Sequence, residues 1–301
     1  MRAYGFTTVG GPEHEAFLDV PVPEPGAGEL LVAVHAAGVN PGDWKVRAGS
    51  YGIEGPAVLG REVAGRVVAT GPDVEGFAVG DEVFGGCPGM VGGWAEQAIV
   101  TAGFAAHRPE SVPPEQACVL PVAAGTAHDA LRQLDLSSGA TLLVNGAGGG
   151  VGVVLVQLAA AHGLRVMATA SPGKHDLLAR LGATPVAYGD GVADRIRKAA
   201  PDGVDGVFDL VGGDPLRTVA GLVRDPHRLI SVADYGLSVE LGGQQLQRDR
   251  STAVLDELVG LVATGDLDPH VTDVRPFDDA AAALALVEHG HATGKVVLDI
   301  G

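Results

Sequence analysis

Residues 141–152 read TLLVNGAGGGVG, and residues 153–161 continue as VVLVQLAAA. The first five residues predict a short buried strand, and the stretch from Val151 to Ala161 is apolar over the length of a helix. Gly146, Gly149 and Gly152 would let the chain turn tightly, let backbone amides approach a diphosphate, and let the helix pack near the strand. The spacing departs from a strict G-x-G-x-x-G pattern, but its position between strand and helix predicts a dinucleotide-binding loop.

The chain after this loop alternates between strand-like and helix-like segments. Further buried strands are expected at residues 165–170, 184–188, 206–210 and 227–232, with helical stretches between them. This alternation predicts an α/β fold with a doubly wound parallel sheet, the Rossmann arrangement. Apolar residues recur at helical spacing within 251–264 and predict one more helix there. The sequence does not assign residues 233–250 to any element.

The N-terminal part has a different pattern. Short strands are expected at residues 30–34, 62–69 and 82–84, separated by Gly and Pro turns, and they predict a β-rich, barrel-like unit. The C-terminal part reads as strand, helix and strand at residues 271–274, 277–289 and 295–300. A last strand this apolar must pair with another, and we expect it to return to the N-terminal unit. The expected domains are therefore residues 1–122, completed by 266–301, and residues 123–265.

Composition limits the possible partners. The chain has 301 residues, 46% of them hydrophobic, and its 37 acidic against 20 basic residues give a formal net charge of −17. This charge argues against binding to nucleic acid or to an anionic membrane. No apolar run approaches the roughly 20 residues of a membrane-spanning helix, and the first residues do not resemble an export signal, so we expect a soluble, cytoplasmic protein. The only cysteines, Cys87 and Cys118, cannot form a zinc site of four thiolates.

The end of the second strand of the α/β domain bears on the choice of cofactor. A site for NAD usually has Asp or Glu there, about 20 residues past the glycine loop, to bind the ribose 2′-hydroxyl. Here residues 169–174 read TASPGK and contain no acid. Ser171 and Lys174 instead suit a 2′-phosphate, the serine as a hydrogen-bond donor and the lysine as a charge. They predict NADPH, although a capped helix start with a solvated lysine is the alternative.

Several separate blocks of sequence carry a family resemblance. In the N-terminal part they are NPGDWK at 40–45, LGREVAG at 59–65, GDEVF at 80–84 and GWAE at 93–96. Further along they are the glycine loop, FDLVG at 208–212 and GKVVL at 294–298. Over essentially its full length the chain resembles the medium-chain dehydrogenase/reductase superfamily. The resemblance implies a GroES-like β-barrel catalytic domain beside the Rossmann domain, and a homodimer.

The resemblance also bears on metal. The zinc alcohol dehydrogenases of this superfamily carry Cys where this chain has Asn40, and His where it has Arg61. Neither an amide nor a guanidinium replaces such a zinc ligand well, so we expect no metal site. The chain therefore resembles the zinc-free quinone oxidoreductases most. In that group Tyr188, at the end of the third strand, looks like a residue that packs on the adenosine 2′-phosphate.

The same resemblance suggests roles for individual residues. Asn40 and Thr126 are expected beside the nicotinamide and its ribose. Lys45 and Tyr51 are candidates for a proton donor or an oxyanion partner, because both carry polar hydrogens in the block that resembles the family's substrate cleft. The expected cofactor-binding set is Thr126, Gly146, Gly149, Gly150, Val151, Gly152, Ser171, Lys174, Tyr188, Val211 and Gly212, with Val211 and Gly212 closing one side of the nicotinamide ring.

The expected chemistry is hydride transfer to a small molecule. Without a metal, the acceptor must be one whose developing negative charge hydrogen bonds can hold, such as a quinone or an α,β-unsaturated carbonyl compound. Residues 168–174 are similar to enoyl reductase domains of polyketide synthases as well, so reduction of an enoyl thioester is an alternative. An NADPH-binding structural or sensing protein with little catalysis is the alternative from another class.

We predict that the purified protein contains no stoichiometric zinc and keeps its activity in chelator, because Asn40 and Arg61 occupy the positions where ligands would be needed. Elemental analysis and an activity assay with and without chelator test this. One zinc per chain, with activity lost on chelation, would contradict it.

Overall fold

The computed structural model describes residues 1–301 and divides into two compact units. Unit 1 consists of Met1–Gly125 and Arg250–Gly301, and unit 2 of Thr126–Asp249. The second boundary differs from the predicted one at residue 265. Helix α9 (Thr252–Thr264) lies in unit 1, where it packs against strand β8 (Ala105–His107), rather than in the α/β unit.

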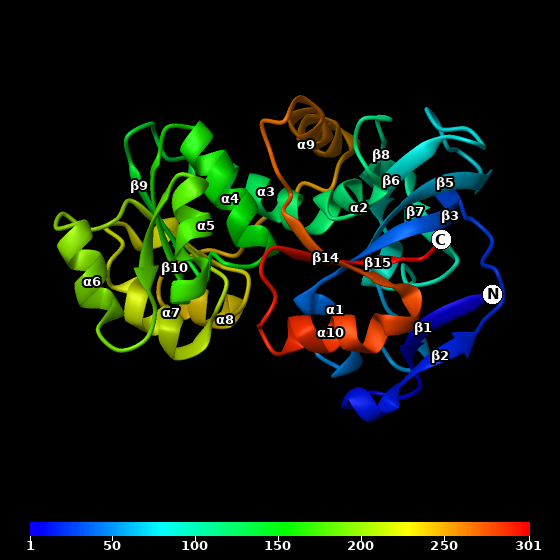
Figure 1. Ribbon diagram of the computed structural model, residues 1–301, viewed down its shortest axis with the longest axis horizontal. Coiled ribbons are helices and arrows are strands. Elements are labelled where there is room, and N and C mark those ends of the chain that lie inside the picture. Colours follow the sequence, from blue (N-terminus) through cyan, green and yellow to red (C-terminus); the bar gives the residue numbers. More distant parts are fainter. The chain divides into compact units, whose positions relative to one another are not determined.

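Unit 2 contains a parallel sheet of five strands, drawn in green to yellow in Figure 1. Its spatial order is β11 (Ala183–Ala187), β10 (Arg165–Ala170), β9 (Thr141–Asn145), β12 (Gly206–Asp209) and β13 (Leu229–Ser231). If the five strands are numbered as they occur in the sequence, their spatial order is 3-2-1-4-5. The chain therefore winds outward from the central strand β9 twice, once to each edge of the sheet. The predicted doubly wound sheet is confirmed, with β9 and β10 at the predicted residues.

Helices pack on this sheet through their apolar faces. They are α3 (Gly125–Leu134), α4 (Gly150–Ala161), α5 (His175–Arg180), α6 (Val192–Ala199), α7 (Gly213–Ala220) and α8 (Tyr235–Glu240), with short 3-10 turns η5 (Pro172–Lys174) and η6 (Pro226–Arg228). The central helix α4 is apolar nearly all round and buries Val153, Val154, Leu155 and Val156, as a helix packed on a parallel sheet must.

The unassigned stretch 233–250 forms α8 and then covers the edge of the sheet. Gln244 bridges to Ile230 of β13, and its backbone N–H donates to the Leu229 carbonyl at 2.8 Å. The next residues are attached to α3, because the Gln133 side chain donates to the Gln245 carbonyl at 3.0 Å and accepts from the Gln247 backbone N–H at 2.8 Å.

Unit 1 is β-rich. Its larger sheet has the order β14 (Val271–Pro276), β15 (Lys295–Asp299), β3 (Glu29–Val39), β5 (Glu62–Thr70), β6 (Glu82–Gly86) and β8, and β7 (Gln97–Thr101) pairs with β3. A smaller sheet joins β2 (Glu15–Asp19), β1 (Arg2–Phe6) and β4 (Ala57–Val58). The expected return of the last strand is confirmed: β15 pairs antiparallel with β3, so red and blue ribbons lie side by side in Figure 1.

Short helices complete unit 1. They are α1 (Pro41–Arg47), α2 (Pro114–Ala117), α9, α10 (Ala280–Glu288), the 3-10 turns η1 (Pro12–His14), η2 (Pro88–Met90), η3 (Ala102–Phe104) and η7 (Phe277–Asp279), and the π-helical turn η4 (Leu120–Ala124). The buried Arg47 of α1 pairs with Glu15 of β2 and, at 2.7 Å, with Glu288 of α10. One guanidinium therefore joins three elements. No helix in the chain combines the length and the apolar character that a membrane span requires.

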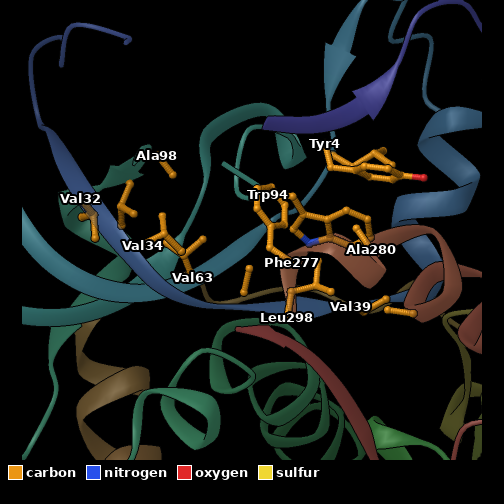
Figure 2. Packing of buried hydrophobic residues seen from close by; sticks show 14 of the residues in the cluster. Tyr4, Val32, Val34, Val39, Val63, Trp94, Ala98, Phe277, Ala280 and Leu298 are labelled. Atoms are coloured by element: carbon orange, nitrogen blue, oxygen red, sulfur yellow. The ribbon is translucent and has the colours of Figure 1, made fainter. Parts of the chain in front are cut away.

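The core of unit 1 draws on both ends of the chain. Figure 2 shows Tyr4 and Trp94 packed with Phe277, Ala280 and Leu298. Trp94 is fully buried, and its indole N–H donates to the Gly38 carbonyl at 3.2 Å, so its one polar group is satisfied. The C-terminal residues are thus part of this core.

Candidate active site

The glycine loop begins where β9 ends. Gly146 has φ of +84°, a conformation that side chains disfavour, and a Cβ there would lie 2.6 Å from Val211. A Cβ at Gly152 would lie 2.4 Å from the Ala147 carbonyl oxygen, so only glycine lets α4 approach the loop this closely. At Gly149 a Cβ would meet nothing within 4 Å, so this part of the loop faces open space within its unit.

The start of α4 offers hydrogen-bond donors beside that open space. The Val153 N–H donates to the Gly149 carbonyl at 3.0 Å and begins the helical pattern. The N–H groups of Gly150, Val151 and Gly152 come before it, in the first turn, where a helix has no intrahelical acceptors. Their dipoles point toward any anion at this end, and the loop therefore fits a diphosphate.

Lys174 lies against the same loop. Its ammonium Nζ is 3.3 Å from the Gly148 carbonyl oxygen, and a Cβ at Gly148 would lie 2.3 Å from the lysine Cδ. Burial lowers the pKa of Lys174. The structure thus brings the predicted phosphate residue and the predicted diphosphate loop together.

Ser171 and Tyr188 follow neighbouring strands. Ala170 of β10 and Ala187 of β11 are paired in register, and Ser171 and Tyr188 are the next residues along each strand. Tyr188 is 64% exposed, and the Arg195 side chain holds its turn by donating to the Ala187 carbonyl at 2.7 Å and to the Asp190 carbonyl at 2.8 Å. The two residues therefore lie at the carboxyl edge of the sheet, where open α/β sheets bind their ligands.

The other predicted cofactor residues of unit 2 lie on α3 and after β12. The Thr126 hydroxyl accepts from the Arg248 guanidinium at 2.8 Å, and the same guanidinium donates to Asp129 at 2.7 Å. Val211 is 48% exposed beside Gly146, and Gly212 has φ of +78°. Arg248 falls in the stretch that the sequence did not assign, and no sequence motif marked it.

Asn40, Lys45 and Tyr51 belong to unit 1, in and around α1. The Asn40 side chain is buried and fully engaged: its Nδ2 donates to Glu62 Oε1 at 2.8 Å, and its Oδ1 accepts from Lys295 Nζ at 2.6 Å. Lys45 lies 5.7 Å from the Trp44 ring centroid, and Tyr51 is 41% exposed. The structure therefore gives Asn40 a bonding role that the sequence did not suggest, and Lys45 and Tyr51 take part in separate contacts.

Glu62 is the centre of this buried network. Besides Asn40 it contacts Lys295 Nζ at 3.1 Å, and its Oε2 accepts from the Val122 N–H at 2.7 Å. The two charged side chains are 0% and 4% exposed, so each depends on the other for charge compensation. A zinc ion does not fit here, because an ammonium already occupies the space beside the amide oxygen. No group of three or more His, Cys, Asp or Glu side chains could hold a metal ion.

Arg61 lies beside the same network. Its Nε is 3.6 Å from Asp43 Oδ1, and its guanidinium is 5.6 Å from the Tyr51 ring centroid. Burial raises the pKa of Asp43 to about 6, although Arg61 and the Asn40 N–H, which donates to Asp43 at 2.7 Å, act in the opposite direction. The sequence singled out Arg61 only as a missing zinc ligand.

Comparison with known proteins establishes the family. The model of the alcohol dehydrogenase GroES-like domain matches residues 26–110, and that of the zinc-binding dehydrogenases matches residues 181–298. A 2-methylene-furan-3-one reductase of Solanum lycopersicum is 31% identical, with 99% of this chain and 79% of the relative covered. A quinone oxidoreductase of Mus musculus is 30% identical, with 99% of this chain and 97% of the relative covered. The chain belongs to the medium-chain dehydrogenase/reductase superfamily, and it is an oxidoreductase.

Solved structures agree with this assignment. The quinone oxidoreductase of Coxiella burnetii has a TM-score of 0.91 and 29% identity, covering 100% of this chain and 99% of its own. Mycobacterial Rv1454c in complex with NADPH has a TM-score of 0.89 and 28% identity, with 100% of both chains covered. The predicted GroES-like and Rossmann domains are confirmed. A further relative, erythronolide synthase EryA2 of Saccharopolyspora erythraea, is 34% identical over 90% of this chain, which spans 8% of that much longer protein.

The raised pKa of Asp43 predicts a pH-dependent stability. The folded-state pKa of about 6 lies above the unfolded value near 3.9, so the folded state holds the proton more tightly. The resulting stabilisation is complete below about pH 4 and is lost as the pH rises through about 6, by about 2–3 kcal/mol. Urea unfolding at several pH values should show that, as the pH rises through this range, the free energy of unfolding of the parent falls more steeply than that of Asp43→Asn. Asp19→Asn, at a 99% exposed side chain, is the control and should follow the parent. Parallel pH profiles for the parent and Asp43→Asn would contradict the assignment.

Proposed function

We propose that this chain is an NADPH-dependent, zinc-independent reductase that transfers hydride to a quinone or an α,β-unsaturated carbonyl compound. One observation carries the cofactor assignment: at the carboxyl edge of the unit 2 sheet, the glycine loop faces open space with the Lys174 ammonium 3.3 Å from its Gly148 carbonyl. A dinucleotide bound on this loop would find there a cation for its 2′-phosphate.

The residues around the loop favour NADPH over NADH. Ser171 and Tyr188 follow paired residues of two neighbouring strands, and no carboxylate occurs among residues 171–174 to accept a hydrogen bond from a ribose 2′-hydroxyl. A 2′-phosphate would instead meet the serine hydroxyl, the lysine ammonium and the exposed tyrosine ring. The NADPH complex of Rv1454c, a structural neighbour, supports the same cofactor.

Each group of residues has a proposed task. When bound, NADPH supplies the hydride. The amides of Gly149, Gly150, Val151 and Gly152 bind the diphosphate, and Thr126, Val211 and Gly212 shape the nicotinamide side. Lys45 and Tyr51 are the candidates to donate a proton or to hold the oxyanion that forms on the acceptor. Asn40 acts through its bonds to Glu62 and Lys295, which fix the start of α1.

The class of acceptor follows from the residues at the positions where the zinc alcohol dehydrogenases carry their metal ligands. Arg61 provides hydrogen-bond donors and a positive charge there, and these suit an acceptor whose charge is delocalised, such as a quinone or an enone. The relatives named quinone oxidoreductase and 2-methylene-furan-3-one reductase support this class. We place the enzyme in the cytoplasm as a homodimer, without nucleic-acid or membrane partners, in line with its net charge of −17.

Reduction of an enoyl thioester is the second candidate, favoured by the 34% identity to erythronolide synthase EryA2. NADPH oxidation followed with quinones, short enones and acyl thioesters distinguishes the two. Tight cofactor binding with no acceptor reduced would instead favour an NADPH-binding structural or sensing protein.

Lys174→Ala should weaken the use of NADPH and spare NADH, because only NADPH carries the 2′-phosphate. A hydrogen bond to a charged group contributes about 1.5–3 kcal/mol, which corresponds to a loss of roughly 10- to 100-fold in kcat/KM. Ser171→Asp should shift the preference toward NADH, since it repels the phosphate and can accept from the 2′-hydroxyl. The measurement is kcat/KM with both cofactors and one quinone.

Lys198→Ala removes a positive charge in the last turn of α6 and is the matched control; it should leave both cofactors unchanged. Two results would refute the phosphate assignment: a parent enzyme that prefers NADH, or an equal loss of both cofactors in Lys174→Ala.

A further inference from the structure

A continuous chain of buried hydrogen bonds runs across the carboxyl ends of the unit 2 strands. The Gly146 N–H donates to Thr169 Oγ1 at 2.9 Å, and the Thr169 hydroxyl donates to Asn145 Oδ1 at 2.6 Å. The Asn145 Nδ2 then donates to Asp209 Oδ1 at 2.7 Å. The glycine loop is therefore connected, through the side chains of Thr169 and Asn145, to a carboxylate on the neighbouring strand β12.

Asp209 extends this chain to the loop that follows its own strand. Its Oδ2 accepts from the Gly212 N–H at 2.9 Å and from the Ser231 hydroxyl at 2.6 Å, and its Oδ1 also accepts from the Val211 N–H at 3.3 Å. Four donors surround one carboxylate that is fully buried. Val211 and Gly212 cannot shift without leaving part of that carboxylate unsatisfied.

Ser231 carries the network to the last strand. Its Oγ accepts from the Ala233 N–H at 3.2 Å and from the Asp234 N–H at 3.0 Å while its own hydrogen points to Asp209. The loop after β13 is thereby attached to the same carboxylate. Loops following β9, β12 and β13 all depend on it.

The chemistry of the groups fixes every direction in this network. A carboxylate only accepts and a backbone N–H only donates, so Asn145 must present its Nδ2 to Asp209 and its oxygen to Thr169. The Thr169 hydroxyl donates its hydrogen to Asn145, and the Ser231 hydroxyl donates its hydrogen to Asp209. Both hydroxyl oxygens accept from backbone N–H groups. Asp209 is therefore the one ultimate acceptor on which all the other orientations depend.

We propose that Asp209 is a positioning residue for the cofactor: paired with Asn145, it fixes the loops that contact the parts common to NADPH and NADH. This inference rests on the proposed function, because it assumes that a nicotinamide dinucleotide binds at this edge. It assigns to Asp209 a role different from that of Lys174, whose contribution is confined to the 2′-phosphate.

Asp209→Asn tests the proposal with little change in shape. The new amide places a donor against either Asn145 Nδ2 or the Gly212 and Ser231 donors, so one side of the network is lost. Dissociation constants for NADPH and NADH, titrated by cofactor fluorescence on the full chain without an acceptor, should both rise by about 10-fold or more and by the same factor.

Exchange of the two side chains should restore the network. In the double variant Asn145→Asp with Asp209→Asn, the amide at 209 donates to the carboxylate at 145, which also accepts from Thr169. Affinity for both cofactors should return to within about 3-fold of the parent, since only the 3.3 Å bond from Val211 is left without its acceptor. Asn145→Asp alone places two carboxylates together and should be the weakest binder.

Asp205→Asn is the matched control. Asp205 precedes the same strand, and its Oδ2 accepts from the Thr141 N–H at 2.8 Å, but at the amino ends of the strands. This substitution should lower the thermal midpoint of unfolding without changing either dissociation constant. Should Asp209→Asn fail to fold, Ser231→Ala removes a single donor and should weaken both cofactors by about 3- to 10-fold.

The outcomes separate this proposal from the proposed function. Unchanged cofactor affinity in Asp209→Asn, or a folded double variant that does not recover affinity, would overturn the positioning role while leaving NADPH binding intact. A parent that binds neither cofactor would overturn the proposed function and, with it, the role of Asp209.

Discussion

The buried carboxylate of Asp209 holds together the loops at the carboxyl edge of the unit 2 sheet, where we propose that the cofactor binds. Burial of an ionised group away from water is costly unless hydrogen-bond donors surround it, and here Asn145, Ser231 and two backbone N–H groups do so. The donors come from three different strand ends, so satisfying one charge determines the paths of several loops. The glycine loop receives its position from the same network, through Thr169.

Unit 1 also contains buried charged groups that must be compensated, here a pair of opposite charges. Glu62 and Lys295 are both buried and lie 233 residues apart in the sequence. Their contacts with Asn40 and with the Val122 N–H hold the start of α1 and the η4 turn. Loss of one partner of such a pair typically costs about 3–5 kcal/mol, because the other charge stays buried without compensation. In both units, residues expected near the chemistry are thus held by buried polar groups from distant segments.

Local sequence signals were sufficient for the fold class, for the strands β9 and β10, and for helix α4, because periodicity and glycine spacing act over a few residues. They also placed Ser171 and Tyr188 at strand ends, which the paired Ala170 and Ala187 bear out. The sequence did not reveal the bonding of Asn40, since its partners Glu62 and Lys295 come from other strands. Residues 233–250 were unassigned because α8 is only one short helix, and the residues after it are held by hydrogen bonds to α3 and to the sheet edge. The domain boundary at 265 differed because the amphipathic pattern of α9 does not say which unit its apolar face covers.

A crystal structure of the full chain with NADPH tests the central claim most directly. The account predicts the cofactor diphosphate at the N–H groups of Gly150 and Val151, and the 2′-phosphate within hydrogen-bond distance of Ser171 or Lys174. It also predicts that Val211 and Gly212 keep their hydrogen bonds to Asp209. Density for the cofactor at any other edge of the sheet, or a 2′-phosphate remote from both Ser171 and Lys174, would contradict it.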